Sequence, residues 1–416
     1  MTGAARLVRM RSRIPPLVLI AAMPFACAGP PGPSSAPSTA PSAAPTGSPP
    51  PARTDTPTPT PVPEPTFGWR AIGEPVVFRD AQVNTIVTVD SGFVAVGCTI
   101  GVDTCRAPVV WFSSDGVDWS RPTELPLLPG ESPRAATAAM ATRDGFFVAG
   151  EVGRGVRIHA ALWVASDGET FERIPDDPSF ADASIGQLLL VNGSLVAVGS
   201  GAYTHYSGFR AWRSEDGITW IATARGPTDD SVPGGVVGFD GGVVAWGDTC
   251  SVCVPETAFW RSADGASWSD ARRELDGEFA HATALGVTHA GLVAFGSVGV
   301  DLASPAAWFL ANGAVAWQAD EPPTQPESTR ISRHLLVGHG AVLAGTNYAG
   351  DSPTGFVWLR GPGDAAWRPP LRAPGVWVVT VLQDPGRPAE LVLVGLVGRD
   401  GRQAVALWSG SVDWAP

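Results

Sequence analysis

From about residue 67 to its end, the chain consists of short runs in which apolar and polar residues alternate. The stretch VNTIVTVDSGFVAVG and the later stretch APVVWFSSDGVDWSR show the pattern. A period of two residues indicates β-strands, and DSG and SDG are typical of tight turns. We therefore expect four antiparallel strands here, over residues 83–89, 93–96, 108–112 and 118–121, which form one small sheet.

The pattern returns seven times, and three ladders of repeated residues mark it. A glycine closes an apolar run in each unit, at Gly97, Gly150, Gly199, Gly247, Gly296, Gly345 and Gly395. A tryptophan follows, at Trp111, Trp163, Trp212, Trp260, Trp308, Trp358 and Trp408, with spacings of 48–52 residues. A second aromatic residue comes 8 or 9 positions later, at Trp119, Phe171, Trp220, Trp268, Trp317 and Trp367. Such repeats are typical of β-propellers. The sequence predicts an all-β, seven-bladed β-propeller of four-stranded antiparallel blades over residues 67–416.

The two ends of this region indicate how the ring closes. In the last unit the two aromatic residues, Trp408 and Trp414, are only 6 positions apart, which is too short for a full hairpin. Trp69 lies 50 residues before Trp119, in register with the fourth-strand ladder although no blade precedes it. We expect the N-terminal segment to supply the outer strand of the seventh blade, which removes an exposed sheet edge. A self-contained seventh blade ending at Trp414 is the alternative.

The residues ahead of the propeller are typical of an exported protein. Residues 1–27 combine a basic segment with about 13 apolar residues and then Cys27, as in a signal peptide. PFAC resembles a bacterial lipobox, which implies lipidation of Cys27, whereas ACA also fits ordinary signal cleavage. Residues 28–66 are rich in Pro, Ser, Ala and Thr and predict a disordered linker. We expect a cell-surface or periplasmic protein held to the membrane by a lipid anchor, with free secretion as the alternative.

Charge narrows the range of partners. The formal net charge is -12 at pH 7, so the chain should repel nucleic acid rather than bind it. CSVC has no second C-x-x-C at the spacing of a zinc site. We therefore expect no metal, no cofactor and a monomeric protein.

Four turn sequences carry a family resemblance. SSDGVDW, ASDGETF, SEDGITW and SADGASW resemble the Asp box, or bacterial neuraminidase repeat, although Asp and Gly are adjacent here. The resemblance implies a sialidase-like propeller with each box between the third and fourth strands of a blade. A carboxylate there can accept hydrogen bonds from its own turn. We expect a structural role for Asp115, Asp167, Asp216 and Asp264, over the alternative that they bind metal or substrate.

The long, variable links between strands two and three, and between blades, should emerge together on one face of the ring, which we call the long-loop face. Loops on a rigid scaffold are where binding residues concentrate. Two disulfides are expected in these loops, Cys98–Cys105 and Cys250–Cys253, over zinc binding or redox catalysis. Rings and arginines there suit sugar or peptide recognition, although loop packing explains them equally well. The candidates for ligand binding are Arg154, Arg157, His159, Tyr203, His205, Tyr206, Tyr348 and Asp351.

The sialidase resemblance implies three arginines around a substrate carboxylate, a tyrosine nucleophile with a glutamate, and an acid/base aspartate. The chain departs from that pattern, because FERIP follows the second Asp-box turn instead of preceding the first blade, and no tyrosine has a glutamate partner by spacing. The sequence therefore favours a binding or scaffold module for a glycan or an envelope protein. A sialidase-like glycoside hydrolase is one alternative. A structural role, similar to the Asp-box propeller that helps assemble photosystem II, is the other.

Overall fold

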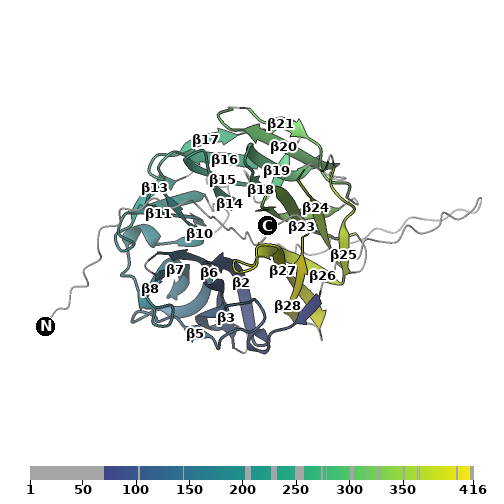
Figure 1. Cartoon of the computed structure of the whole chain (residues 1–416). Coiled ribbons are helices and arrows are strands. Elements are labelled where there is room, and N and C mark those ends of the chain that lie inside the picture. Colours follow the sequence, from purple (N-terminus) through teal and green to yellow (C-terminus); the bar gives the residue numbers. More distant parts are fainter. Residues whose placement is uncertain are drawn as a thin grey trace, which may run out of the picture.

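A computed structural model describes residues 70–412, apart from 102–103, 144, 202–207, 226–231, 249–256, 273–274, 278, 300–303, 315, 326–327, 350–351, 363, 365 and 400–401. Seven four-stranded antiparallel sheets stand around one axis, so the fold is the predicted seven-bladed β-propeller (Figure 1). The expected signal peptide, linker and Cys27 lie outside the described residues. No helix within the described residues has the length and apolar character needed to cross a membrane.

The first six blades use strands in chain order, from the axis outward. They are β2 (Ala81–Val89), β3 (Gly92–Ile100), β4 (Cys105–Ser113) and β5 (Thr123–Glu124); β6 (Ser132–Thr142), β7 (Gly145–Arg154), β8 (Arg157–Ala165) and β9 (Glu172–Arg173); β10 (Ala183–Val191), β11 (Ser194–Gly201), β12 (Phe209–Ser214) and β13 (Ile221–Arg225); β14 (Val232–Phe239), β15 (Gly242–Asp248), β16 (Thr257–Ser262) and β17 (Ser269–Arg272); β18 (His281–Val287), β19 (Gly291–Val298), β20 (Ser304–Ala311) and β21 (Gln318–Asp320); and β22 (Thr329–Val337), β23 (Gly340–Asn347), β24 (Thr354–Arg360) and β25 (Leu371–Pro374). Two short 3-10 turns, η1 (Val76–Phe78) and η2 (Pro178–Phe180), precede the first and third blades.

The seventh blade joins the two ends of the propeller. Its strands are β26 (Val376–Gln383), β27 (Glu390–Arg399), β28 (Arg402–Ser411) and, outermost, β1 (Arg70–Gly73). β1 pairs with β28 through Arg70↔Ser409, Ala71↔Trp408 and Gly73↔Leu407. The prediction that the N-terminal segment supplies the outer strand is confirmed, and the alternative of a self-contained seventh blade is wrong.

The predicted position of the fourth strand in the first blade is also wrong. Instead of residues 118–121, the outer strand is β5, Thr123–Glu124. The stretch after the Asp box is hydrogen-bonded to β4 partly through a side chain. Phe112 N donates to Ser120 Oγ (3.0 Å), and Ser120 N donates to Phe112 O (2.8 Å). A hydroxyl thus takes the place of a backbone carbonyl, and the regular ladder begins only after Pro122.

The glycine ladder is explained by a bulge that recurs in every inner strand. In β10, for example, Ile185 pairs with Gly199 and Gln187 pairs with Val198, which leaves Gly186 unpaired. The register shifts at the same place in β2, β6, β14, β18, β22 and β26. The bulge pushes a carbonyl of the inner strand toward the ladder glycine, where a Cβ on Gly199 would lie 1.9 Å from Ser184 O. A side chain of any size is therefore excluded there.

The bulged residues also tie neighbouring blades together near the axis. Asn84 Nδ2 donates to Ala136 O (2.8 Å), and Thr283 Oγ1 donates to Ile331 O (2.7 Å), in each case from one inner strand to the next. Thr137 and Ser332 make the same kind of bond, to Ile185 O and Val378 O. In the third and fourth blades the bulged residue is a glycine and has no side chain to donate.

The tryptophans of the third strands form the core between blades. Trp111, Trp163, Trp212, Trp308 and Trp358 are among the largest fully buried side chains. Four of these indoles donate from Nε1 to a carbonyl in the link that enters their own blade, namely Trp163 to Pro126, Trp212 to Ser179, Trp308 to Asp276 and Trp358 to Thr324. The ladder therefore both fills the core and fixes the inter-blade links.

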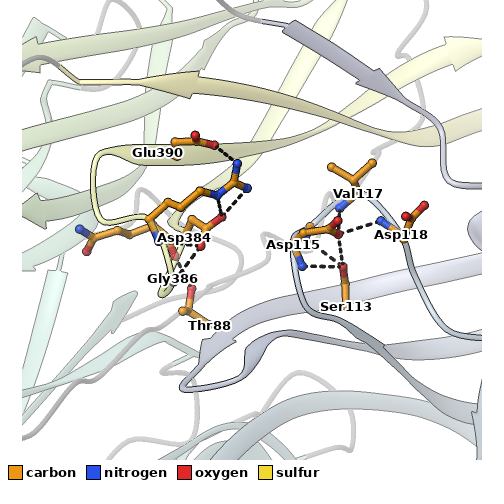
Figure 2. A network of polar contacts seen from close by, with 11 residues as sticks. Thr88, Ser113, Asp115, Val117, Asp118, Asp384, Gly386 and Glu390 are labelled. Atoms are coloured by element: carbon orange, nitrogen blue, oxygen red, sulfur yellow. Dashed lines mark hydrogen bonds and ion pairs between the residues drawn. The ribbon is translucent and has the colours of Figure 1, made fainter.

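A polar cluster closes the seam between the seventh and first blades on the face opposite the long loops (Figure 2). The other inner turns are short, but β26 and β27 are joined by residues 384–389, which departs from the expected tight link. The nearly buried Asp384 pairs with Arg387 (Oδ2 to Nη2, 2.7 Å), which also pairs with Glu390 (2.7 Å). The hydrogen bond to Asp384 is the largest influence on Arg387 and raises its pKa, and Asp115 of the first blade adds to the effect. Beside this cluster, Thr88 Oγ1 of β2 donates to Gln383 O of β26 (3.1 Å), so ring closure has a second support in addition to β1.

Candidate functional site

The Asp-box turns lie on the face opposite the long loops. Asp216 Oδ1 accepts hydrogen bonds from Ile218 N (2.8 Å) and Thr219 N (2.7 Å), and Gly217 adopts a φ of 76°. Burial alone would raise the pKa of Asp216, but bonds from Thr219, Ile218 and Ser214 outweigh it and hold the pKa below 3.8. Asp115, Asp167 and Asp264 accept from their own turns in the same way. Each of these oxygens is thus already engaged by its own turn.

The sixth blade closes the corresponding turn differently. Its sequence, PGDAAW, departs from the Asp box, yet Asp364 Oδ2 accepts from Gly361 N (2.7 Å) and from Arg368 Nε (2.9 Å). The bond from Gly361, followed by the one from Arg368, lowers the pKa of Asp364. A carboxylate at a shifted position therefore does what the Asp box does elsewhere.

The first predicted disulfide is confirmed, since Cys98 and Cys105 are joined between β3 and β4 on the long-loop face. Cys250 and Cys253 lie outside the described residues. Among the described residues there is no group of three or more His, Cys, Asp or Glu side chains placed to hold a metal ion.

The candidate residues of the second blade are held by ion pairs. Arg154 pairs with Glu131 (3.4 Å) and with Asp176, and Arg157 pairs with Asp182 (2.8 Å). His159 forms a backbone bridge with Ala181. The side chain of Glu131 is fully buried and also pairs with the nearly buried side chain of Arg173 (3.0 Å). The contacts around Arg154 and Arg157 therefore fix the links on either side of the blade.

The seam between the sixth and seventh blades has a different character. Tyr348, directly after β23, is 39% exposed and meets the ring of Trp377 of β26 edge-on, with 5.2 Å between centroids. Burial raises the pKa of the Tyr348 hydroxyl, and the charge of the exposed Arg330 acts in the opposite direction. The structure therefore brings Tyr348 together with two residues that the sequence had not singled out, Trp377 and Arg330. Tyr203, His205, Tyr206 and Asp351 lie outside the described residues.

Two ionisable residues are buried in the inner strand of the sixth blade. His334 packs on Gly286, where a Cβ would lie 1.8 Å from its Nδ1 atom, and stacks on Phe295. Burial, aided by the charge of Arg333, lowers the pKa of His334 to about 3, so this side chain is neutral at pH 7. Arg333 is only 8% exposed, and burial lowers its pKa to about 10, which leaves it charged at pH 7.

One solved structure is similar enough to support the fold. The polysaccharide lyase Uly1 is similar with a TM-score of 0.51 and 12% identity, over 79% of this chain and 90% of that one. The GH32 β-fructofuranosidase of Bombyx mori has a TM-score of 0.39 and 11% identity, over 82% and 94%. The sucrose-6-phosphate hydrolase of Lactobacillus gasseri has a TM-score of 0.34 and 12% identity, over 80% and 91%. No protein-family model matches the sequence, and no curated protein matches it. At these identities the likeness concerns the fold alone.

Proposed function

We propose that the protein is an extracytoplasmic binding module that holds a glycan on the long-loop face of its propeller. The observation that carries the proposal is the Tyr348–Trp377 pair, whose rings meet edge-on at the seam between the sixth and seventh blades. Tyrosine and tryptophan rings offer apolar faces for sugar rings and a polar edge for hydroxyl groups. The signal peptide, the linker and lipidation of Cys27, which the sequence predicts, would hold the propeller clear of the membrane.

A sialidase-like hydrolase is the weaker alternative. A tyrosine nucleophile requires activation by an adjacent base or a lowered pKa. Burial raises the pKa of Tyr348, and within the described part of the chain the charged group that acts on it is the arginine Arg330. Among the described residues, no carboxylate is placed to serve this hydroxyl as a base. The chemistry around Tyr348 therefore favours binding over catalysis.

A glycan array probed with the full chain tests the proposal. We expect discrete saccharides to bind the wild type and to lose most of their signal with a Tyr348→Ala, Trp377→Ala double variant. His289→Ala, an exposed ring in a turn on the opposite face, is the matched control and should bind as the wild type does. Melting curves of all three proteins show whether they are folded. Equal binding by the double variant, or turnover of a fluorogenic sialoside by the wild type, would contradict the proposal.

A further inference from the structure

The inner-strand bulge puts two arginines of the sixth blade on one side of its sheet. In an unbroken strand, residues three apart point to opposite faces. Here Arg330 pairs with Thr346 and Arg333 pairs with Ala344, which are alternate residues of β23, so both arginines leave the sheet on the same face. Ala344 belongs to a buried cluster with Val378 and Val381 of the seventh blade. The shared face is therefore the one that packs toward the seventh blade.

Arg333 is a buried cation that has no counter-charge within the part of the chain that the structure describes. Its Nε atom is fully buried and has no hydrogen-bond acceptor, and no carboxylate of the described residues forms an ion pair with it. The residue as a whole is 8% exposed, so a small part of the side chain stays open to solvent. Buried charges are ordinarily paired, since an unpaired charge is strongly destabilising. An anion from outside the chain would supply the missing partner.

The propeller repeat does not demand an arginine at this position. The residues that follow the bulge in the other six inner strands are uncharged, namely Thr85, Ala138, Gln187, Gly235, Ala284 and Thr380. Two of them, Ala138 and Ala284, belong to the apolar core. A guanidinium at this place is therefore a departure from the repeat, confined to the blade that also carries Tyr348.

We propose that Arg330 and Arg333 bind the anionic group of an acidic saccharide whose sugar rings lie on Tyr348 and Trp377. A guanidinium offers a planar set of donors that matches a carboxylate or a sulfate. Tyr348 comes two residues after Thr346, the β23 partner of Arg330, and its N–H donates to Ser328 O (3.1 Å), so Tyr348 lies beside Arg330 and the arginines adjoin the aromatic pair. This inference rests on the proposed glycan-binding function and adds the charge class of the ligand.

The test is calorimetric titration of the full chain with three probes. These are an oligogalacturonide, its fully methyl-esterified form, which keeps the rings but not the charge, and a sulfated galactan oligosaccharide. We expect the wild type to bind the oligogalacturonide, the sulfated probe or both at least tenfold more tightly than the neutral ester. The preferred acidic probe shows whether the site takes a carboxylate or a sulfate.

Three variants assign the effect to the arginines. Arg333→Gln and Arg330→Gln should each weaken binding of the preferred acidic probe at least tenfold and leave binding of the ester unchanged. Arg121→Gln, at an exposed position after the first Asp box, should change neither. Arg333→Gln should also melt at a temperature no lower than the wild type, since it removes an unpaired buried charge. Should it fail to fold, Arg330→Gln decides alone.

The outcomes separate the inference from the function on which it rests. Equal affinity of the wild type for the acid and the ester, or full acidic binding by both arginine variants, overturns the anion site while glycan binding stands. Binding of none of the probes, together with a blank glycan array, overturns both.

Discussion

Replacement of the ladder glycine Gly199 by alanine should destabilise the propeller strongly. A Cβ at this position would lie 1.9 Å from Ser184 O and 2.9 Å from Ile185 Cα, both of them backbone atoms. Relief requires the bulge in β10 to move, and overpacking of this kind costs about 1–3 kcal/mol or more. We expect a loss of about 3 kcal/mol in the free energy of unfolding, measured by urea denaturation with linear extrapolation.

Gly186→Ala is the matched control in the same blade. The nearest atom to a Cβ on Gly186 is Val198 O at 3.9 Å, and the residue is exposed. Both substitutions restrict the unfolded chain equally, which stabilises each variant by about 0.4–1 kcal/mol, so the difference between them isolates the contact in the folded state. If Gly199→Ala and Gly186→Ala unfold within about 0.5 kcal/mol of each other, a tolerance typical of surface changes, the steric account of the glycine ladder is refuted.

Three further predictions concern closure, the disulfide and pH. Deletion of residues 64–74 removes β1 and should cost about 3 kcal/mol, at ~1 kcal/mol for each lost pair, visible as a lower melting temperature, whereas deletion of 28–60 should change nothing. Replacement of both Cys98 and Cys105 by serine should lower the free energy of unfolding, measured by urea denaturation, by about 2.5 kcal/mol, because the unfolded chain regains loop entropy. An unchanged urea midpoint would contradict a stabilising role for the disulfide. Because the folded pKa of Asp216 lies below 3.8, its stabilisation is complete above that pH and is lost as the pH falls through the folded value. Between pH 7 and pH 3, wild-type stability should therefore fall more steeply than that of Asp216→Asn, and parallel curves would contradict this.

Much of the fold could be predicted because the repeat states it seven times. The tryptophan spacing gave the number of blades, and the unmatched Trp69 indicated the closing strand. The boundary of the fourth strand in the first blade could not be predicted. There the Ser120 hydroxyl accepts the hydrogen bond that a backbone carbonyl accepts in a regular strand pair, and the alternation of apolar and polar residues does not reveal this.

The site was only partly predictable, since it depends on contacts between blades. Tyr348 was found from its loop, but its partner Trp377 belongs to the next blade and reads in the sequence as a core residue. The arginines of the second blade drew attention as exposed charges, yet Arg154 is held by Glu131 and Asp176, residues that lie outside its own loop. A signal for Arg333 was present in the sequence. When the seven units are aligned on their ladder glycines, Arg333 occupies a position at which the other six units have an uncharged residue.

The placement of β1 has a mechanical consequence. Everything ahead of Arg70 is connected to the propeller through the outermost strand of one blade, which three residue pairs hold to β28. Tension on that leading segment would reach the ring at its rim and act first on those pairs, before any inner strand bears load. The closing strand would thus detach first under force, while the inner strands, four of which are joined to the next by the bonds of Asn84, Thr137, Thr283 and Ser332, stay in place.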